Sequence, residues 1–209
     1  NVDCDVVRTL SKADLRSLVR LAKSNGDYAQ ERENISFTIL PDNRSVIANM
    51  NWVETDATDT ADLSRAQSEG RRKVLENITF MRKYVPGFKN CILSTMATSL
   101  GVREGRRILG EYTLTEEDVL DGRRFDDGIA LGSWPIEYHN LETRSVEYRF
   151  VKADYHIPYR CLVPRRINNL LAVGRSVSAT TAALASVRVM GPCTAMGHAA
   201  GTAMRLCVR

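Results

Sequence analysis

Residues near the C-terminus combine small side chains with a Gly-Pro step, and this combination can place the N-terminus of a helix against a ligand. Residues 188–204 have the sequence RVMGPCTAMGHAAGTAM. Pro192 suits the first turn of a helix, where its missing N–H leaves no hydrogen bond unmade. A helix that begins near Cys193 therefore directs free N–H groups and the positive end of its dipole toward residues 191–194. Such a helix end favours an anion or an electron-rich carbonyl.

The rest of this predicted helix has two interpretations. Gly197 and Gly201 let another backbone or a planar ligand approach closely, or they form a packing seam between helices without any ligand. The spacing alone leaves both interpretations open. The position of Cys193 at the helix start predicts a lowered thiol pKa. No second cysteine lies near it in sequence, so no dithiol chemistry is expected.

Four other residues are candidates for catalysis or substrate binding. Arg103 in GVREGRR can bind an anion, or it can form a structural ion pair with Glu104 or Glu111. His139, one of three histidines, is a candidate general acid–base group or a structural side chain. Tyr159 and Arg160 in IPYR precede the last predicted strand. Both can face a substrate cavity or belong to the core and surface of the fold.

Composition narrows the class of protein. The chain has 209 residues, 44% hydrophobic and 26% charged, as in an ordinary globular protein. Its net charge of +4 is mild, and its arginine pairs are scattered beside carboxylates, so no nucleic-acid partner is expected. The sequence contains no apolar run of about 18 residues, so no membrane partner is expected.

Cysteine usage and the first residue bear on localisation and completeness. The five cysteines are widely spaced without a C-x-x-C, which indicates neither a zinc site nor a dithiol motif. No metal is expected. Scattered thiols are typical of a reducing compartment, which predicts a cytoplasmic protein. The chain begins at Asn1 rather than Met, which suggests a fragment or a processed chain.

Local signals predict the elements of the first three quarters of the chain. Ser11 is expected to cap a helix that runs to Ser24, and Thr115 to cap a short acidic helix. Hydrophobic periodicity predicts a long helix over residues 60–84, which Pro86-Gly87 ends. Residues 35–40 and 45–50 predict a hairpin joined by PDNR. Further strands are expected in three segments: 91–98, 106–114 and 145–153.

These elements have no repeated βαβ rhythm, so residues 1–155 predict an α+β domain with an antiparallel sheet. Residues 156–209 differ. The apolar run Leu170–Val173 is typical of a strand buried on both faces of a parallel sheet, followed by Gly174 and the small-residue helix. One strand, one turn and one helix make a single βα unit, which cannot form a doubly wound domain alone.

A resemblance to a known family covers roughly residues 45–206. The segment IPYRCLVPRRINNLLAVGRSVSATTAALASVRVMGPCTAMGHAAGTAM, residues 157–204, closely resembles the C-terminal segment of FAD-dependent oxidoreductases of the glutathione-reductase-like, two-dinucleotide-fold type. The segment GVREGRRILGEYTLTEEDVLDGRRFDDGIALGSWPIEYH, residues 101–139, is similar to the substrate-side region of the same family.

The resemblance implies FAD as cofactor, a small organic substrate and hydride transfer between that substrate and the flavin. It implies that residues 1–155 form a substrate domain and that residues 156–209 are the last βα unit of a Rossmann-like FAD-binding domain. Gly174 and Arg175 would line the ribityl–diphosphate side of the cofactor. The flavin pyrimidine edge would face the start of the last helix: Met190, Gly191, Pro192, Cys193 and Thr194. Gly197 and Gly201 would serve close packing behind it.

The resemblance also implies a site for Arg103 near the flavin ring. In the family, a G-x-G-x-x-G turn holds the ADP part of FAD, and this sequence contains no such motif. The N-terminal nucleotide-binding module is therefore expected to be absent from this chain or carried by a separate subunit, and the chain is expected to be inactive alone. The competing hypothesis is a non-catalytic ligand- or partner-binding module whose small-residue helix serves packing only.

Overall fold

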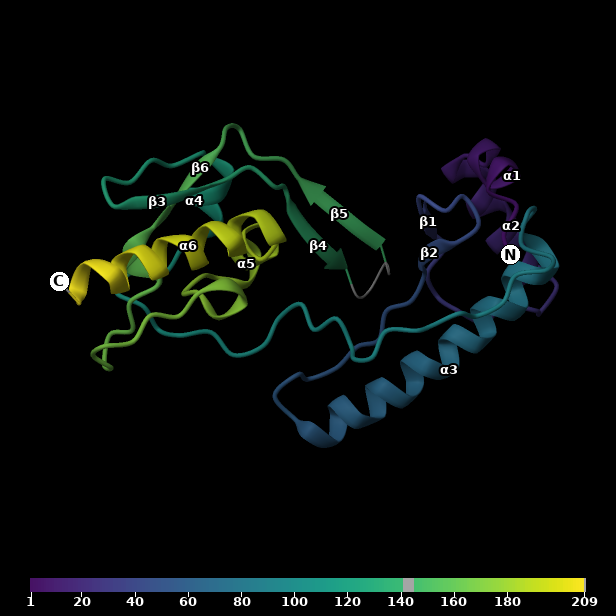
Figure 1. The fold of residues 1–209 in the computed structure, drawn as a ribbon, viewed down its shortest axis with the longest axis horizontal. Helices are drawn as coiled ribbons and strands as arrows, with labels where there is room; N and C mark the ends of the chain where they lie inside the picture. The colour runs from purple at the N-terminus through teal and green to yellow at the C-terminus, as the bar shows by residue number, and fades with distance from the viewer. Residues whose placement is uncertain (141–144, 209) are drawn as a thin grey trace. The chain divides into compact units, whose positions relative to one another are not determined.

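The computed structural model describes residues 1–140 and 145–208 and divides the chain into two compact units, Asn1–Gly101 and Val102–Arg209 (Figure 1). The described residues form helices together with small antiparallel sheets, so the fold is of the mixed α+β kind that the sequence predicts. Each described sheet has two strands: β1 with β2, β3 with β6, and β4 with β5.

The first unit consists of three helices and one hairpin. Its elements are α1 (Cys4–Thr9), α2 (Lys12–Ser24), β1 (Ser36–Ile39), β2 (Val46–Asn49) and α3 (Thr60–Tyr84). Strands β1 and β2 pair antiparallel, which confirms the predicted hairpin. Phe80, Phe88 and Tyr28 lie at the centre of its core, and the Tyr28 hydroxyl donates to Asn77 Oδ1 at 2.7 Å.

Helix boundaries in the first unit follow the predicted caps. Ser11 accepts from the Asp14 N–H at 3.1 Å, and the Asp14 carboxylate accepts from the Ser11 N–H at 2.9 Å. These two bonds form a capping box that fixes the start of α2. Helix α3 ends at Tyr84, before Pro86, and Gly87 has a φ of +86°. Local side-chain chemistry therefore determined both predicted helices.

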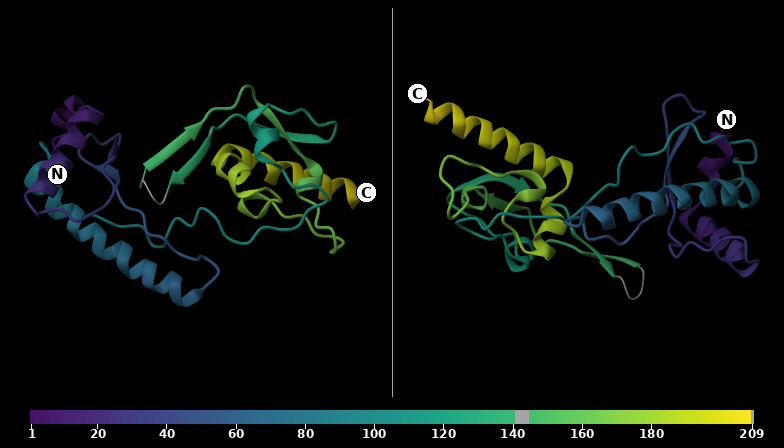
Figure 2. Two further views of the ribbon diagram at one scale, coloured as in Figure 1. Left: turned by 180° about the vertical axis from the view of Figure 1, so that it is seen from behind. Right: turned by 90° about the horizontal axis from the view of Figure 1, so that it is seen from below.

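The second unit contains the remaining elements. The helices are α4 (Glu116–Leu120), α5 (Thr181–Val187) and α6 (Met190–Cys207), with short 3-10 turns at Tyr159–Cys161 and Gly174–Ser176. The strands are β3 (Gly128–Gly132), β4 (Ile136–Asn140), β5 (Ser145–Arg149) and β6 (Tyr155–Pro158). In this unit α6 packs against β3 and α5 packs against β4. The β4–β5 hairpin projects from the rest of the unit in both views of Figure 2.

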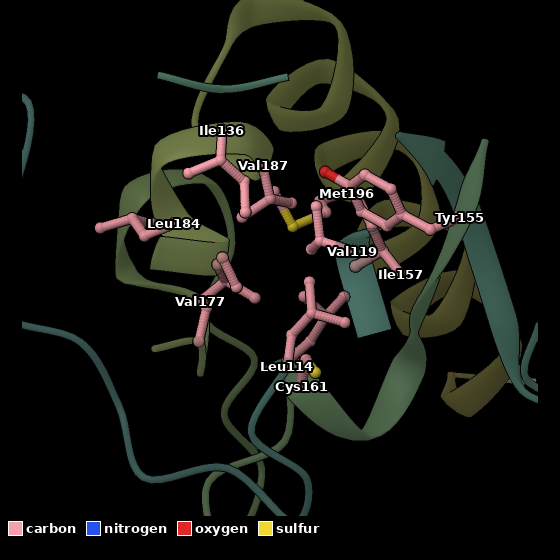
Figure 3. Close-up of a cluster of buried hydrophobic side chains, with 13 residues drawn as sticks. Leu114, Val119, Ile136, Tyr155, Ile157, Cys161, Val177, Leu184, Val187 and Met196 are labelled. Atoms are coloured by element: carbon pink, nitrogen blue, oxygen red, sulfur yellow. The ribbon is translucent and has the colours of Figure 1, made fainter. Parts of the chain in front are cut away.

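The core of the second unit joins segments that are distant in sequence. Figure 3 shows Ile136 of β4 beside Val187 of α5, and Tyr155 of β6 near Met196 of α6. Strand β6 pairs with β3, so residues on both sides of position 155 share one core. The division of the chain into a substrate domain, residues 1–155, and a cofactor-binding unit, residues 156–209, stays a prediction.

Three segments predicted as strands differ in the structure. Residues 91–98 and Leu170–Val173 belong to no strand among the described residues. Residues 106–114 form only isolated bridges, at Gly110 and Leu114. A strand requires a partner edge, and none pairs continuously with these apolar runs in the described chain. Leu170 is 45% exposed, so the predicted burial of this segment on both faces is wrong for the chain as it folds here.

Candidate functional site

The N-terminus of α6 presents backbone donors to solvent. The helix begins at Met190, three residues before the position expected from the sequence, so Pro192 lies in its first turn as predicted. The cap residue Val189 makes no side-chain hydrogen bond. Met190 is 87% exposed, and Gly191 and Thr194 are exposed as well. The first turn can therefore donate N–H groups to a ligand.

Gly174 and Cys193, both predicted to face the cofactor, lie together in the structure. Gly174 has a φ of +67°, and a Cβ added there would lie 3.8 Å from Cys193 Sγ. The 3-10 turn that begins at Gly174 packs against α6, and Arg175 beside it is exposed. A left-handed glycine conformation without a side chain gives a ligand access to the backbone. The structure thus brings the two predicted groups of cofactor residues to one place.

Burial decides the acidity of Cys193. The thiol is partly buried, and burial raises its pKa, whereas the nearby charges of Arg175 and Arg188 lower it by less. The thiol also donates to the Arg188 carbonyl oxygen at 3.2 Å. The prediction of a lowered pKa is therefore wrong, because loss of hydration outweighs the positive surroundings.

The face of α6 that carries Gly197 and Gly201 is open in the described part of the chain. A Cβ added at Gly197 or at Gly201 would meet no atom within 4 Å in the described structure. The buried face consists of Pro192, Met196 and Ala200, which are spaced four residues apart and so lie on one side of the helix. The close packing predicted behind Gly197 and Gly201 is therefore not made by the described residues.

Arg103 is held by a carboxylate that the sequence analysis did not select. Its Nη1 lies 2.7 Å from Glu137 Oε1 on β4, rather than pairing with Glu104 or Glu111 as the structural alternative expected. The second oxygen of Glu137 lies 3.7 Å from Arg188 Nη2. Glu137 therefore lies between two guanidinium groups that are 85 positions apart in the chain.

Tyr159 and Arg160 lie in the 3-10 turn that follows β6. The Asp127 carboxylate accepts from Arg160 Nε at 2.9 Å and from Nη2 at 3.1 Å. The guanidinium also lies 5.3 Å from the centre of the Tyr112 ring. Tyr159 is half-buried and packs against the core. These two hydrogen bonds hold the turn against Asp127, the residue before β3. Such a bidentate pair is typical of the planar guanidinium group of Arg.

His139 is a residue of β4, where its backbone pairs with Val146 of β5. Its side chain lies outside the described part of the molecule. Arg103 and Arg160 have different carboxylate partners, Glu137 and Asp127. The contacts thus group Arg103 with Glu137 and Arg188, and group Gly174 with Cys193.

Glu137 and Arg188 are the residues that the sequence analysis missed. Arg188 is the only charged residue in the apolar segment ASVRVMG. An isolated charge in such a segment indicates a side chain with a specific partner. No local feature of the sequence indicates Glu137, because its two arginine partners are distant in sequence. Among the described residues, no group of three or more His, Cys, Asp or Glu side chains is arranged to hold a metal.

A model of the family described as FAD dependent oxidoreductase matches residues 3–209. No curated protein and no solved structure matches the chain. None of the helices in the described part of the chain combines the length and apolar character that crossing a bilayer requires.

Proposed function

The chain belongs to the family of FAD-dependent oxidoreductases, and we propose that its last 54 residues, 156–209, form one side of the cofactor site. The observation that carries this proposal is the meeting of Gly174 with the first turns of α6. The family resemblance predicts a cofactor contact for both segments from residue order alone. FAD, the cofactor of the family, supplies the hydride chemistry when it is bound.

The residues at this place fit a flavin cofactor. The glycine conformation at Gly174 leaves its backbone accessible, and the exposed Arg175 offers a positive charge suited to a diphosphate. The first turn of α6 has no side-chain cap, so the N–H groups of Met190 and Gly191 can donate to acceptor atoms of a bound ring. The dipole of this 18-residue helix favours negative charge at the same end.

The substrate side of the proposal rests on four residues. Arg103 binds an anionic group, and His139 acts as a general acid–base group toward the substrate. Tyr159 and Arg160 line the substrate cavity from the turn after β6. The reaction proposed is hydride transfer between a small organic substrate and the flavin. The Asp127 contacts of Arg160 support a positioning role for this turn.

A nucleotide-binding module completes the proposed enzyme. The sequence has no G-x-G-x-x-G turn, so we propose that such a turn is supplied by a further segment of the same polypeptide or by a separate subunit. The chain alone is then expected to bind FAD weakly and to be inactive. All five cysteines are free thiols, which supports a reducing, cytoplasmic location.

Flavin absorption tests the proposal. The protein purified together with its nucleotide-binding module should show the visible bands of bound flavin. Gly174→Val should reduce the flavin content, because a branched side chain at a positive φ disturbs the turn beside Cys193. Gly197→Ala, on the open face of α6, should retain it.

A colourless protein that takes up no FAD when this module is present would reject the oxidoreductase assignment and favour a non-catalytic binding module. Equal flavin content in the two glycine variants would reject the proposed location of the cofactor.

A further inference from the structure

Arg188 occupies an unusual place for a charged side chain. It caps the C-terminus of α5 and immediately precedes Val189, the cap of α6. Its side chain is only 12% exposed, and that of Glu137 is 14% exposed. A long cationic side chain is seldom this buried unless its charge is compensated. The 3.7 Å separation of Arg188 Nη2 from Glu137 Oε2 gives only a loose ion pair.

The core beneath explains why these two residues meet. Ile136 and Val187 are buried in the same cluster and lie side by side (Figure 3). Glu137 and Arg188 are the next residues in β4 and after α5, so both emerge at the rim of this contact. Glu137 also binds Arg103 Nη1 at 2.7 Å. Two guanidinium groups therefore lie against one carboxylate, and the core fixes the elements that carry Glu137 and Arg188.

Several charged side chains among the described residues act on Arg188 at this place. Burial lowers the pKa of Arg188, and so do the charges of Arg103 and Arg175, against the opposing effect of Glu137 and Glu104. Glu104 itself pairs with Arg107 at 3.0 Å. Within the described part of the chain, this cluster contains two glutamates, Glu104 and Glu137, and four arginines: Arg103, Arg107, Arg175 and Arg188. An anion placed here would reduce the repulsion among the guanidinium groups.

We propose that Arg188 and Arg103 form a binding site for the carboxylate of an organic substrate, which competes with Glu137 for the two guanidinium groups. The substrate role rests on the function proposed above. Glu137 already shows that a carboxylate fits between these two side chains, which favours a planar carboxylate over a tetrahedral anion. The Cys193 thiol donates to the Arg188 carbonyl oxygen at 3.2 Å and also lies beside Gly174, so a carboxylate bound here would lie on the cofactor side of the unit.

Binding of propionate to the 209-residue chain tests the site without a flavin readout. The ¹⁵N-labelled chain is titrated with sodium propionate, with neutral propionamide and with inorganic phosphate, at constant ionic strength. We expect saturable shifts of the Glu137 and Arg188 amides with propionate, none with propionamide and weaker ones with phosphate. Absence of saturable propionate binding would overturn the proposal, and so would tighter binding of phosphate than of propionate.

Variants separate a binding role from a structural one. Arg188→Met should weaken propionate binding about tenfold or more, because a charge-assisted hydrogen bond is lost. Glu137→Gln should tighten it several-fold, since a competing negative charge is removed. Arg205→Met, an exposed arginine in the last turn of α6, should leave binding unchanged. If Arg188→Met does not fold, the Glu137→Gln result decides, because a purely structural ion pair predicts no gain in binding.

The two proposals can fail separately. Propionate binding through Arg188 in a protein that never takes up FAD would reject the flavoprotein function and retain the anion site. Flavin binding without any effect of Arg188→Met or Glu137→Gln on propionate would reject the anion site alone.

Discussion

Gly174 and Cys193 lie close enough that a Cβ on the glycine would be 3.8 Å from the cysteine sulfur. The turn after residues 170–173 and the first turn of α6 therefore share one surface. The contact distance is ordinary, so space alone does not require glycine at position 174. The positive φ does, because L side chains are strained in the left-handed region.

This relationship predicts opposite effects for two glycine-to-alanine substitutions. Gly174→Ala should destabilise the second unit by about 1–2 kcal/mol, since alanine must adopt a φ of +67°. Gly197→Ala should stabilise it by up to about 1 kcal/mol, because alanine is the better helix former and no described residue opposes its methyl group. Denaturant unfolding followed by Trp134 fluorescence, in a Trp52→Phe background, measures both changes. A stability gain at position 174 would contradict the left-handed turn.

Thiol reactivity tests the surroundings of Cys193. Alkylation of the native chain should modify exposed Cys207 first, partly buried Cys193 more slowly, and Cys161 only after unfolding. Burial raises the pKa of Cys161 to about 12, so its thiolate is scarce at neutral pH. Arg175→Met should slow modification of Cys193 further, because the arginine charge lowers the pKa of that thiol. Peptide mapping after timed alkylation gives the rates.

Arg166→Met is the control for this experiment, since Arg166 is exposed and makes no contribution to the Cys193 pKa. Faster labelling of Cys193 than of Cys207 would show that the helix end, rather than burial, governs its reactivity.

Asp118 is predicted to make the stability of the second unit sensitive to acid. Asp118 is only 2% exposed, and burial alone would raise the pKa of its carboxyl group. Hydrogen bonds from the Thr115 backbone, Tyr112 and Arg123 outweigh burial, so the pKa lies below the ordinary 3.8. A lowered folded-state pKa means that the ionised form favours folding. This contribution is present above pH 3.8 and is lost as the pH falls through the lower folded-state value.

Asp118→Asn should therefore destabilise the unit by about 2 kcal/mol at neutral pH, through weakened hydrogen bonds to a buried charge. The difference from the unsubstituted chain should shrink as the pH falls below 3.8. Unfolding midpoints across this range measure it. Asp121→Asn removes an exposed carboxylate that pairs with Lys152 and should have little effect. A difference independent of pH would show that Asp118 does not act through its charge.

Gly132 is predicted to tolerate no side chain. It pairs with Tyr155 across the β3–β6 ladder, and an added Cβ would overlap the tyrosine ring. Tyr155 is fully buried, and its hydroxyl is 2.7 Å from Ser186 Oγ, so the ring has little freedom to move. Gly132→Ala should cost about 1–3 kcal/mol, as overpacked cores do. Gly105→Ala, with open space around it, is the matched control, and equal unfolding midpoints for the two variants would contradict this packing.

Local chemistry in the sequence determined the starts of α2 and α4, the end of α3 and the first hairpin. The capping residues Ser11 and Thr115 act on amides three positions away, and Pro192 constrains only its own turn, so no distant residue is needed to interpret them. The resemblance carried by residues 157–204 predicted the family in the same way, because it depends on residue order alone.

The tertiary structure decided what depends on distant partners. The apolar run Leu170–Val173 forms no strand in the described chain, since a strand exists only where another edge completes its hydrogen bonds. Burial reversed the predicted direction of the Cys193 pKa shift. The meeting of Glu137 and Arg188 arises because the core brings β4 beside α5. Ion pairs and hydration depend on distances in space, and only the folded chain fixes those distances.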